Sequence, residues 1–194
     1  MENQSNNERL LSQNKDEISA ADDFREYLAS LSQPRTISLS DAFDAYLAGA
    51  MNIDAFDTEL WFAVLDMLDK KKDRVDLLPV SVQFFYSSRY LEWEVANGGF
   101  AQAAFNIPQL FPLAREGYSV LGLTKAVKMI ARAEKYIAEG EAEFKTPCGG
   151  DIGELFEEFL DSKLSKLKVR QDSEFWATEQ RVAYAVQNRK DFEN

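Results

Sequence analysis

Apolar residues recur at intervals of three and four along most of this chain, and this periodicity constrains the fold more than any other feature. The clearest case is DAFDTELWFAVLDMLDKKKD, residues 54–73, where six apolar side chains follow one helical stripe. Similar patterns cover residues 22–31, 38–50, 78–96, 107–122, 124–140, 151–169 and 173–189. No hairpin dipeptide stands between alternating runs. The sequence therefore predicts an all-α protein, a compact bundle-like array of about seven to nine helices.

Length and composition indicate one domain. A chain of 194 residues with 45% hydrophobic side chains can bury a core of its own. Residues 1–20 are polar and rich in Asn, Gln and Ser, so we expect a flexible N-terminal arm, followed by a single helical domain over 21–194. The segment 79–96 is apolar around more of its circumference than the other stripes, which predicts a central helix.

The absence of histidine excludes many kinds of chemistry. Without imidazole the chain has no Ser-His or Cys-His relay and no histidine ligand for a metal. Cys148 is the only cysteine, so it has no partner for an internal disulfide. Because the chain has no histidine, no imidazole can activate its thiol. Neither a P-loop nor an EF-hand spacing occurs. We therefore predict a protein that is not an enzyme, with no cofactor, no metal and no catalytic residue.

The net charge of −11 narrows the range of partners. Phosphate backbones and anionic membranes would repel this chain, whereas basic proteins would be attracted to it. The charge is uneven, with a net −9 over residues 1–66, +3 over 67–133 and −5 over 134–194. Apolar runs fall short of the roughly 20 residues that span a bilayer, and the N-terminus lacks a signal-peptide pattern. These features predict a cytoplasmic location.

Carboxylates at helical spacing predict two acidic surfaces. Steps of three or four residues place charges about 4.5–6 Å apart along a helix, a distance comparable with phosphate spacing in nucleic acid. The sets are Asp66, Asp69, Asp73 and Asp76, which share a stripe if the helix at 54–73 continues that far, and Glu154, Glu157, Glu158 and Asp161. Each would fit the cleft of a basic DNA-binding protein. The alternative is that they only keep the protein soluble; the second set lacks the Glu-x-x-His pattern of di-iron proteins.

The stretch YLEWEVANGGFAQAAFN, residues 90–106, interrupts a helical pattern with two glycines. Together with the proline-containing link at 107–112 and the amphipathic segment at 113–133, this stretch resembles a family of small bacterial all-helical proteins. That family includes a DNA mimic that binds a transcription factor. The resemblance covers about Asp57 to Asn188. The motif residues are Glu94, Asn97, Gly98, Gly99, Phe100, Gln102 and Asn106. Two positions usually aromatic in that family are Ala103 and Ala104 here.

We interpret the motif mainly as a structural corner. Asn97 and Gly98 are expected to take left-handed conformations, Gly99 to allow a close turn, and Phe100 to enter the core as a short helix begins. Gln102 and Asn106 would bond the exposed ends of the backbone.

Three functions remain open. The first is a non-enzymatic acidic protein, implied by the resemblance to be a DNA mimic, whose partner is a basic protein such as a transcription factor. The second is a small-ligand pocket or unusual enzyme centred on Glu94, Asn97, Gln102 and Asn106. The third is an immunity-type inhibitor of a basic toxin. The sequence leaves the oligomeric state open, a dimer included.

Overall fold

The computed structural model describes residues 37–144, 152–170 and 173–193. The helices below all belong to one compact unit, Leu39–Asn194. The predicted arm at 1–20, the stripe at 22–31 and Cys148 lie outside the described residues.

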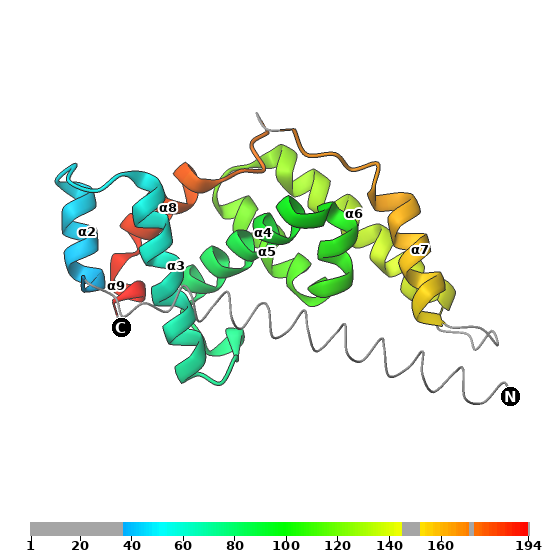
Figure 1. Cartoon of the computed structure of the whole chain (residues 1–194), viewed down its shortest axis with the longest axis horizontal. Helices are drawn as coiled ribbons and strands as arrows, with labels where there is room; N and C mark the ends of the chain where they lie inside the picture. Colours follow the sequence, from blue (N-terminus) through cyan, green and yellow to red (C-terminus); the bar gives the residue numbers. More distant parts are fainter. Residues whose placement is uncertain (1–36, 145–151, 171–172, 194) are drawn as a thin grey trace, which may run out of the picture. The chain divides into compact units, whose positions relative to one another are not determined.

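Within the described ranges the chain forms eight α-helices, two short 3₁₀-helices and no β-strand, which confirms the prediction of an all-α array (Figure 1). The α-helices are α2 Leu39–Leu47, α3 Ile53–Lys70, α4 Val80–Asn106, α5 Phe111–Val120, α6 Thr124–Phe144, α7 Ile152–Leu164, α8 Thr178–Gln187 and α9 Arg189–Phe192. The 3₁₀-helices are η1 Val75–Leu77 and η2 Pro108–Leu110. None of the helices described is long and apolar enough to pass through a lipid bilayer.

Local signals explain where several helices begin and end. Asn52 precedes α3, and its side-chain oxygen accepts a hydrogen bond from the backbone N–H of Ala55 at 2.8 Å. Gly122 follows α5 with a φ of 78°, where glycine is favoured. At the start of α6 the N–H groups of Lys125 and Ala126 donate to the carboxylate of Glu174. The first turn of α6 is therefore capped by a carboxylate from a distant part of the chain.

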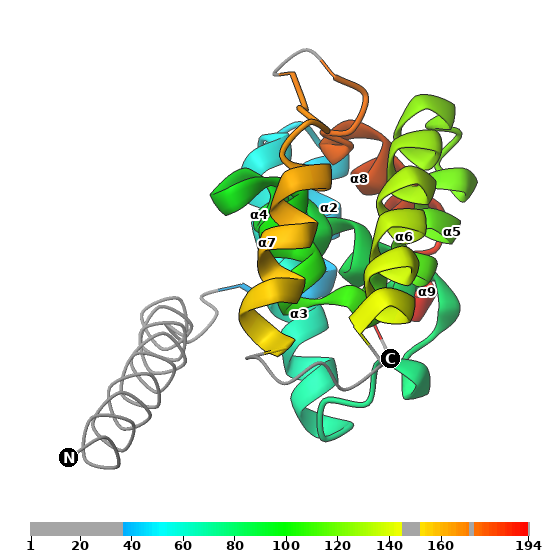
Figure 2. The same cartoon turned by 90° about the vertical axis from the view of Figure 1, so that its right-hand side faces the viewer.

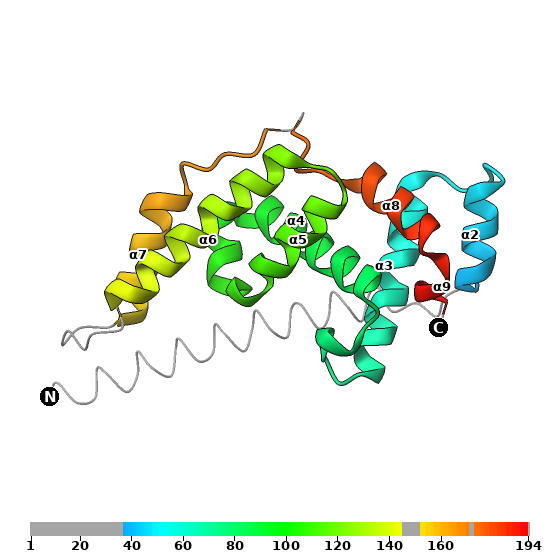
Figure 3. The same ribbon diagram turned by 180° about the vertical axis from the view of Figure 1, so that it is seen from behind.

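The central position predicted for residues 79–96 is confirmed, because α4 contacts α3, α5, α6, α7, α8 and α9. Figures 1 and 3 show α3, α8 and α9 beside the first part of α4, with α2 beyond them, and α5, α6 and α7 beside its second part. Figure 2 shows α6 and α7 as neighbours that cover α4 at this end. Phe85, Leu91, Phe100, Tyr118 and Phe175 are almost completely buried at the contacts.

Four charged side chains join α3, α4 and α8 inside this core. Arg181 of α8 is only 1% exposed. Its Nη1 donates to Glu92 Oε1 of α4 at 2.7 Å, and its Nε lies 3.3 Å from Asp57 Oδ1 of α3. Arg89 Nε reaches the second oxygen of Asp57 at 2.8 Å. Two cations and two carboxylates thus offset one another, which buried ionised groups require.

The carboxylate of Glu92 also fixes the backbone before α8. Glu92 Oε1 accepts a hydrogen bond from the N–H of Ala177 at 2.7 Å. The hydroxyl of Tyr118 donates to the carbonyl of Phe175 at 2.7 Å and lies 3.3 Å from Glu92. Burial and the negative charge of Glu92 both raise the pKa of Tyr118 well above its usual value. The network therefore holds the segment leading into α8 as well as the helices.

Replacing Arg181 should destabilise the fold strongly. Arg181→Met leaves Glu92 buried without its cation, so we expect the free energy of unfolding to fall by about 3–5 kcal/mol. The matched control is Arg189→Met, whose guanidinium also pairs with a carboxylate, Asp44, and lies over an aromatic ring, but is 27% exposed. That change should cost much less, because solvent already screens a partly exposed ion pair. Urea unfolding followed by circular dichroism measures both, and equal losses would contradict a dominant role for the buried network.

Candidate functional site at the corner of helix α4

The two glycines of the motif bend α4 without ending it. Gly98 has φ −151° and ψ 18°, and Gly99 has φ 76° and ψ −172°, a region that only glycine enters readily. Asn97 keeps helical angles. The expectation of left-handed Asn97 and Gly98 is therefore wrong: the positive φ falls on Gly99. The helix resumes at once and continues to Asn106, so the second piece is part of α4.

Phe100 lies in the core, as predicted. It is 1% exposed, and its ring centroid lies 6.3 Å from that of Phe111 and 5.4 Å from that of Phe175. Aromatic rings at these separations add to the energy of burial. The side chain therefore secures the resumed helix against α5 and against the segment before α8.

Gln102 and Asn106 bind a side chain and not the ends of the backbone, which corrects the prediction. Gln102 Nε2 donates to Glu94 Oε2 at 3.2 Å, and Asn106 Nδ2 donates to the same oxygen at 2.8 Å. Glu94 is 2% exposed. The three residues form what we call the Glu94 cluster, which closes the bend because its members stand on both sides of it. Asn97 is exposed.

Gly98 is needed for this cluster for a steric reason. A Cβ atom at this position would stand 1.9 Å from Gln102 Oε1 and 2.8 Å from Gln102 Cβ. Only a residue without a side chain leaves Gln102 its place beside Glu94. Glu92 and Glu94 meanwhile serve separate clusters, Glu92 with Arg181 and Glu94 with the two amides.

The first predicted acidic set does not form one helical stripe. Asp66 and Asp69 lie exposed on α3, but that helix ends at Lys70. Lys72 and Asp73 then adopt positive φ values of 54° and 59°, and the N–H of Asp73 bonds the carbonyl of Leu68 at 3.0 Å. This left-handed turn closes the helix.

Asp76, the last member of that set, lies in η1 and is paired. Two nitrogens of Arg74 reach its two carboxylate oxygens at 2.7 and 2.6 Å. The hydrogen bonds from Arg74 lower the pKa of Asp76. We call Asp66, Asp69, Asp73 and Asp76 the α3 surface, although a turn divides it.

The second predicted set lies on a single helix. Glu154, Glu157, Glu158 and Asp161 all belong to α7, and the side chains of Glu157, Glu158 and Asp161 are exposed. We call this set the α7 surface. Among the described residues no group of three carboxylate or thiol side chains is placed to hold a metal ion.

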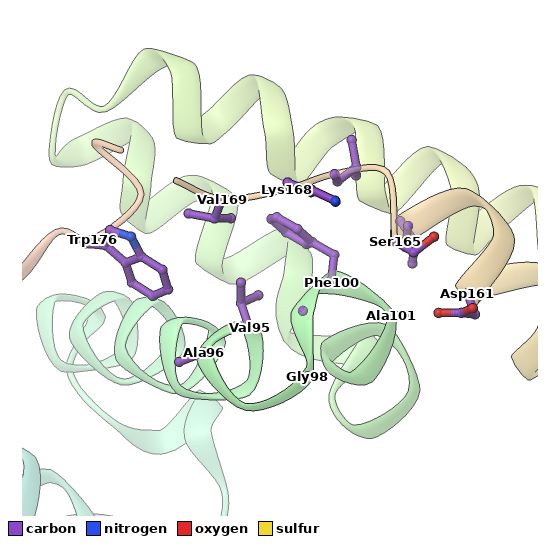
Figure 4. A pocket seen from close by; sticks show the side chains of 13 residues that line it. Val95, Ala96, Gly98, Phe100, Ala101, Asp161, Ser165, Lys168, Val169 and Trp176 are labelled. Atoms are coloured by element: carbon purple, nitrogen blue, oxygen red, sulfur yellow. The ribbon is translucent and has the colours of Figure 1, made fainter. Parts of the chain in front are cut away.

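Both surfaces border cavities beside α4. A cavity of about 460 Å³, which we call the kink groove, separates α4 from the segment after α7. In Figure 4 Val95 and Ala96 face Val169 and Trp176 across it, with Asp161 at one end. A neighbouring cavity of about 270 Å³ is lined by Gly98, Ala101, Gln102, Phe105, Glu157, Leu160 and Asp161.

A third cavity lies on the other side of α4. It measures about 490 Å³, and we call it the tyrosine cavity. Asp73 and Asp76 line it from the α3 surface, Tyr86 and Tyr90 from α4, and Asn106 from the Glu94 cluster. Tyr86 is buried and Tyr90 is partly buried against the core, and their place at a cavity was not predicted from the sequence. The available signal was the spacing of four between the tyrosines, on the helix that the glycines bend.

Most of the site lies within a segment that matches a known protein family. The family model of the DMP19-like proteins matches residues 76–189. The matched segment includes the bend, the Glu94 cluster, α7 and Arg181, whereas α2, α3 and Asp73 precede it. Neither a curated protein nor a solved structure shows significant similarity to the chain.

A methyl group at position 98 should release Gln102 from Glu94. In Gly98→Ala we expect the side-chain amide resonances of Gln102 to shift, and the free energy of unfolding to fall by about 1–3 kcal/mol, because a buried carboxylate loses a donor. Gly49→Ala is the control for the NMR readout alone: a Cβ there meets no atom within 4 Å, so the Gln102 resonances should not shift, although the φ of 73° strains alanine and lowers the stability for a separate reason. NMR and urea unfolding give the two readouts. Unchanged Gln102 resonances in Gly98→Ala would contradict the steric role of Gly98.

Proposed function

This chain belongs to the DMP19-like protein family, and we propose that it is a non-enzymatic acidic protein that binds a basic DNA-binding protein by mimicking DNA. The main support is the exposure of the α7 surface, three of whose carboxylates reach solvent from one helix. Glu158 and Asp161 are three residues apart, and Glu157 and Asp161 four, so successive charges rise by about 4.5–6 Å. Phosphates along nucleic acid are spaced on a similar scale.

The distribution of cations supports the same proposal. Arg89 and Arg181 are paired with buried carboxylates, and Arg74, Arg115 and Arg189 are paired with Asp76, Glu134 and Asp44. Five of the seven arginines among the described residues are therefore held by acids of the same chain. Because the net charge is −11, exposed carboxylates remain for a basic partner. Lys163, Lys166 and Lys168 follow the α7 surface along the chain.

The α7 surface is the better candidate for the contact. It lies within the segment that matches the family, whereas Asp66, Asp69 and Asp73 precede that segment. Its carboxylates also follow one regular helix, while a left-handed turn divides the α3 surface. A rigid row of charges meets a basic cleft with less loss of conformational freedom than a divided one.

The Glu94 cluster gives less support to an enzyme or a ligand pocket centred on it. The amide groups of Gln102 and Asn106 donate to a carboxylate of the same chain, and Glu94 is buried. Groups that satisfy one another at a bend serve the fold first. The proposed function therefore uses the corner as a support for the surrounding surfaces.

Neutralising the α7 surface should weaken the partner's binding more than its charge alone explains. The test variant is Glu157→Gln/Glu158→Gln/Asp161→Asn. The control is Asp54→Asn/Glu116→Gln/Glu179→Gln, which removes three exposed carboxylates elsewhere and changes the net charge equally. A partner captured by the full-length protein should bind the test variant about ten- to a hundredfold more weakly and the control within about threefold, because close charge pairs contribute most.

Salt and DNA complete that experiment. The affinity between this protein and its partner should fall steeply between about 50 and 200 mM salt. Duplex DNA should separate the two proteins, because it competes for the DNA-binding site of the partner. Binding that ignores salt would count against a charged interface. A salt-sensitive partner that DNA does not displace would favour the immunity-type inhibitor over the DNA mimic. Equal losses in the test and control variants would exclude the α7 surface as the contact.

A further inference from the structure

The tyrosine cavity combines an aromatic wall with carboxylates at its edge. Tyr86 and Tyr90 come from the first part of α4, and Asp73 comes from the turn after α3. The rings of Trp61 and Tyr86 stack, with centroids 5.6 Å apart and an interplanar angle of 8°. Trp61 therefore covers one face of the Tyr86 ring, and another part of Tyr86 lines the cavity. Aromatic rings and carboxylates both attract cations, the first through the quadrupole of the ring and the second through charge.

The protein uses this combination three times within its own fold. Arg181 lies over Phe85 at 5.6 Å and pairs with Glu92. Arg89 lies over Trp61 at 5.8 Å and pairs with Asp57. Arg189 lies over Phe43 at 5.0 Å and pairs with Asp44. In each case an arginine fills the space between a ring and a carboxylate. The tyrosine cavity offers the same two kinds of group around a space of about 490 Å³.

Negative charge reaches the cavity from two directions. Asp73 and Asp76 lie at its edge together with Arg74, which holds Asp76 in a two-point contact and leaves Asp73 as the carboxylate open to a ligand. Behind Asn106 lies the buried carboxylate of Glu94. The pKa of Tyr90 is raised by burial and then by the charge of Glu94. The pKa of Tyr86 is also raised, first by burial and then by Tyr90 and Asp73. Both phenols therefore stay neutral hydroxyls over the physiological range.

We propose that the tyrosine cavity binds an arginine side chain of the basic partner, between the tyrosine rings and Asp73. The source of the arginine rests on the proposed function, but the site itself does not. Arginine fits better than lysine, because its planar guanidinium is weakly hydrated, stacks on aromatic faces and pairs with a carboxylate through two hydrogen bonds. The cavity would supply a specific anchor beside the less selective attraction of the acidic surfaces.

The test uses a small probe and the full-length chain. N-acetyl-arginine amide is titrated into isotope-labelled protein at constant ionic strength, with the lysine and citrulline analogues as comparisons. Citrulline keeps the shape of arginine but carries no charge. We expect saturable NMR shifts at Tyr86, Tyr90 and Asn106, with arginine binding more tightly than lysine and citrulline weakest.

Variants locate the site. Tyr90→Leu and Asp73→Asn should each weaken binding of the arginine probe by about three- to tenfold, the range expected for a lost ring contact or a lost ion pair. Asp73 is exposed, so its replacement should leave the fold intact, and circular dichroism checks both variants. Arg74→Gln releases Asp76 from its ion pair and should strengthen binding. Glu157→Gln, on the α7 surface, is the control and should change nothing.

The outcomes separate this inference from the proposed function. Absence of saturable shifts, equal binding of citrulline, tighter binding of lysine, or unchanged affinity in both Tyr90→Leu and Asp73→Asn would overturn the arginine site. If the probe binds as expected but no salt-sensitive, DNA-displaced partner is found, the proposed function fails and the site stands. If such a partner binds while the probe does not, the site fails and the proposed function stands.

Discussion

The pairing of Arg181 with Glu92 and Asp57 is the interaction on which the rest of the structure depends. It joins three helices that are far apart in the sequence, and Glu92 also holds the N–H of Ala177 at the start of α8. A buried ion pair adds little stability compared with apolar packing of the same volume, but breaking it is costly. Its main effect here is to select one arrangement of α3, α4 and α8, and so to set the direction from which α4 enters its bend.

The bend then connects the motif with the surfaces. Because Gly99 turns the chain and Glu94 holds Gln102 and Asn106, the end of α4 returns toward its beginning, and cavities lie on both sides of the helix. Residues of the α3 surface line one cavity, and residues of the α7 surface line the others. The corner thus places two acidic regions and two tyrosines around one helix, although it carries no reactive group of its own.

Periodicity allowed the helices to be predicted, because an amphipathic stripe depends only on neighbouring residues. The central position of α4 and the burial of Phe100 followed in the same way. The partners of Arg181, Glu92 and Glu94 could not be predicted, since they depend on contacts between distant segments. The end of α3 at Lys70 was also missed: the carboxylates kept their helical spacing through Asp76, and only the left-handed turn at Lys72 and Asp73 shows that the backbone had left the helix.

The position of Asp57 has a consequence for the boundaries of this fold. Asp57 pairs with both Arg89 and Arg181, yet it stands before the segment that matches the DMP19-like family. A chain shortened to residues 76–189 would keep both arginines and lose the carboxylate they share, leaving the buried Arg181 with Glu92 and the partly exposed Arg89 without Asp57. Helix α3 therefore supplies a carboxylate on which the charged core of the family segment depends.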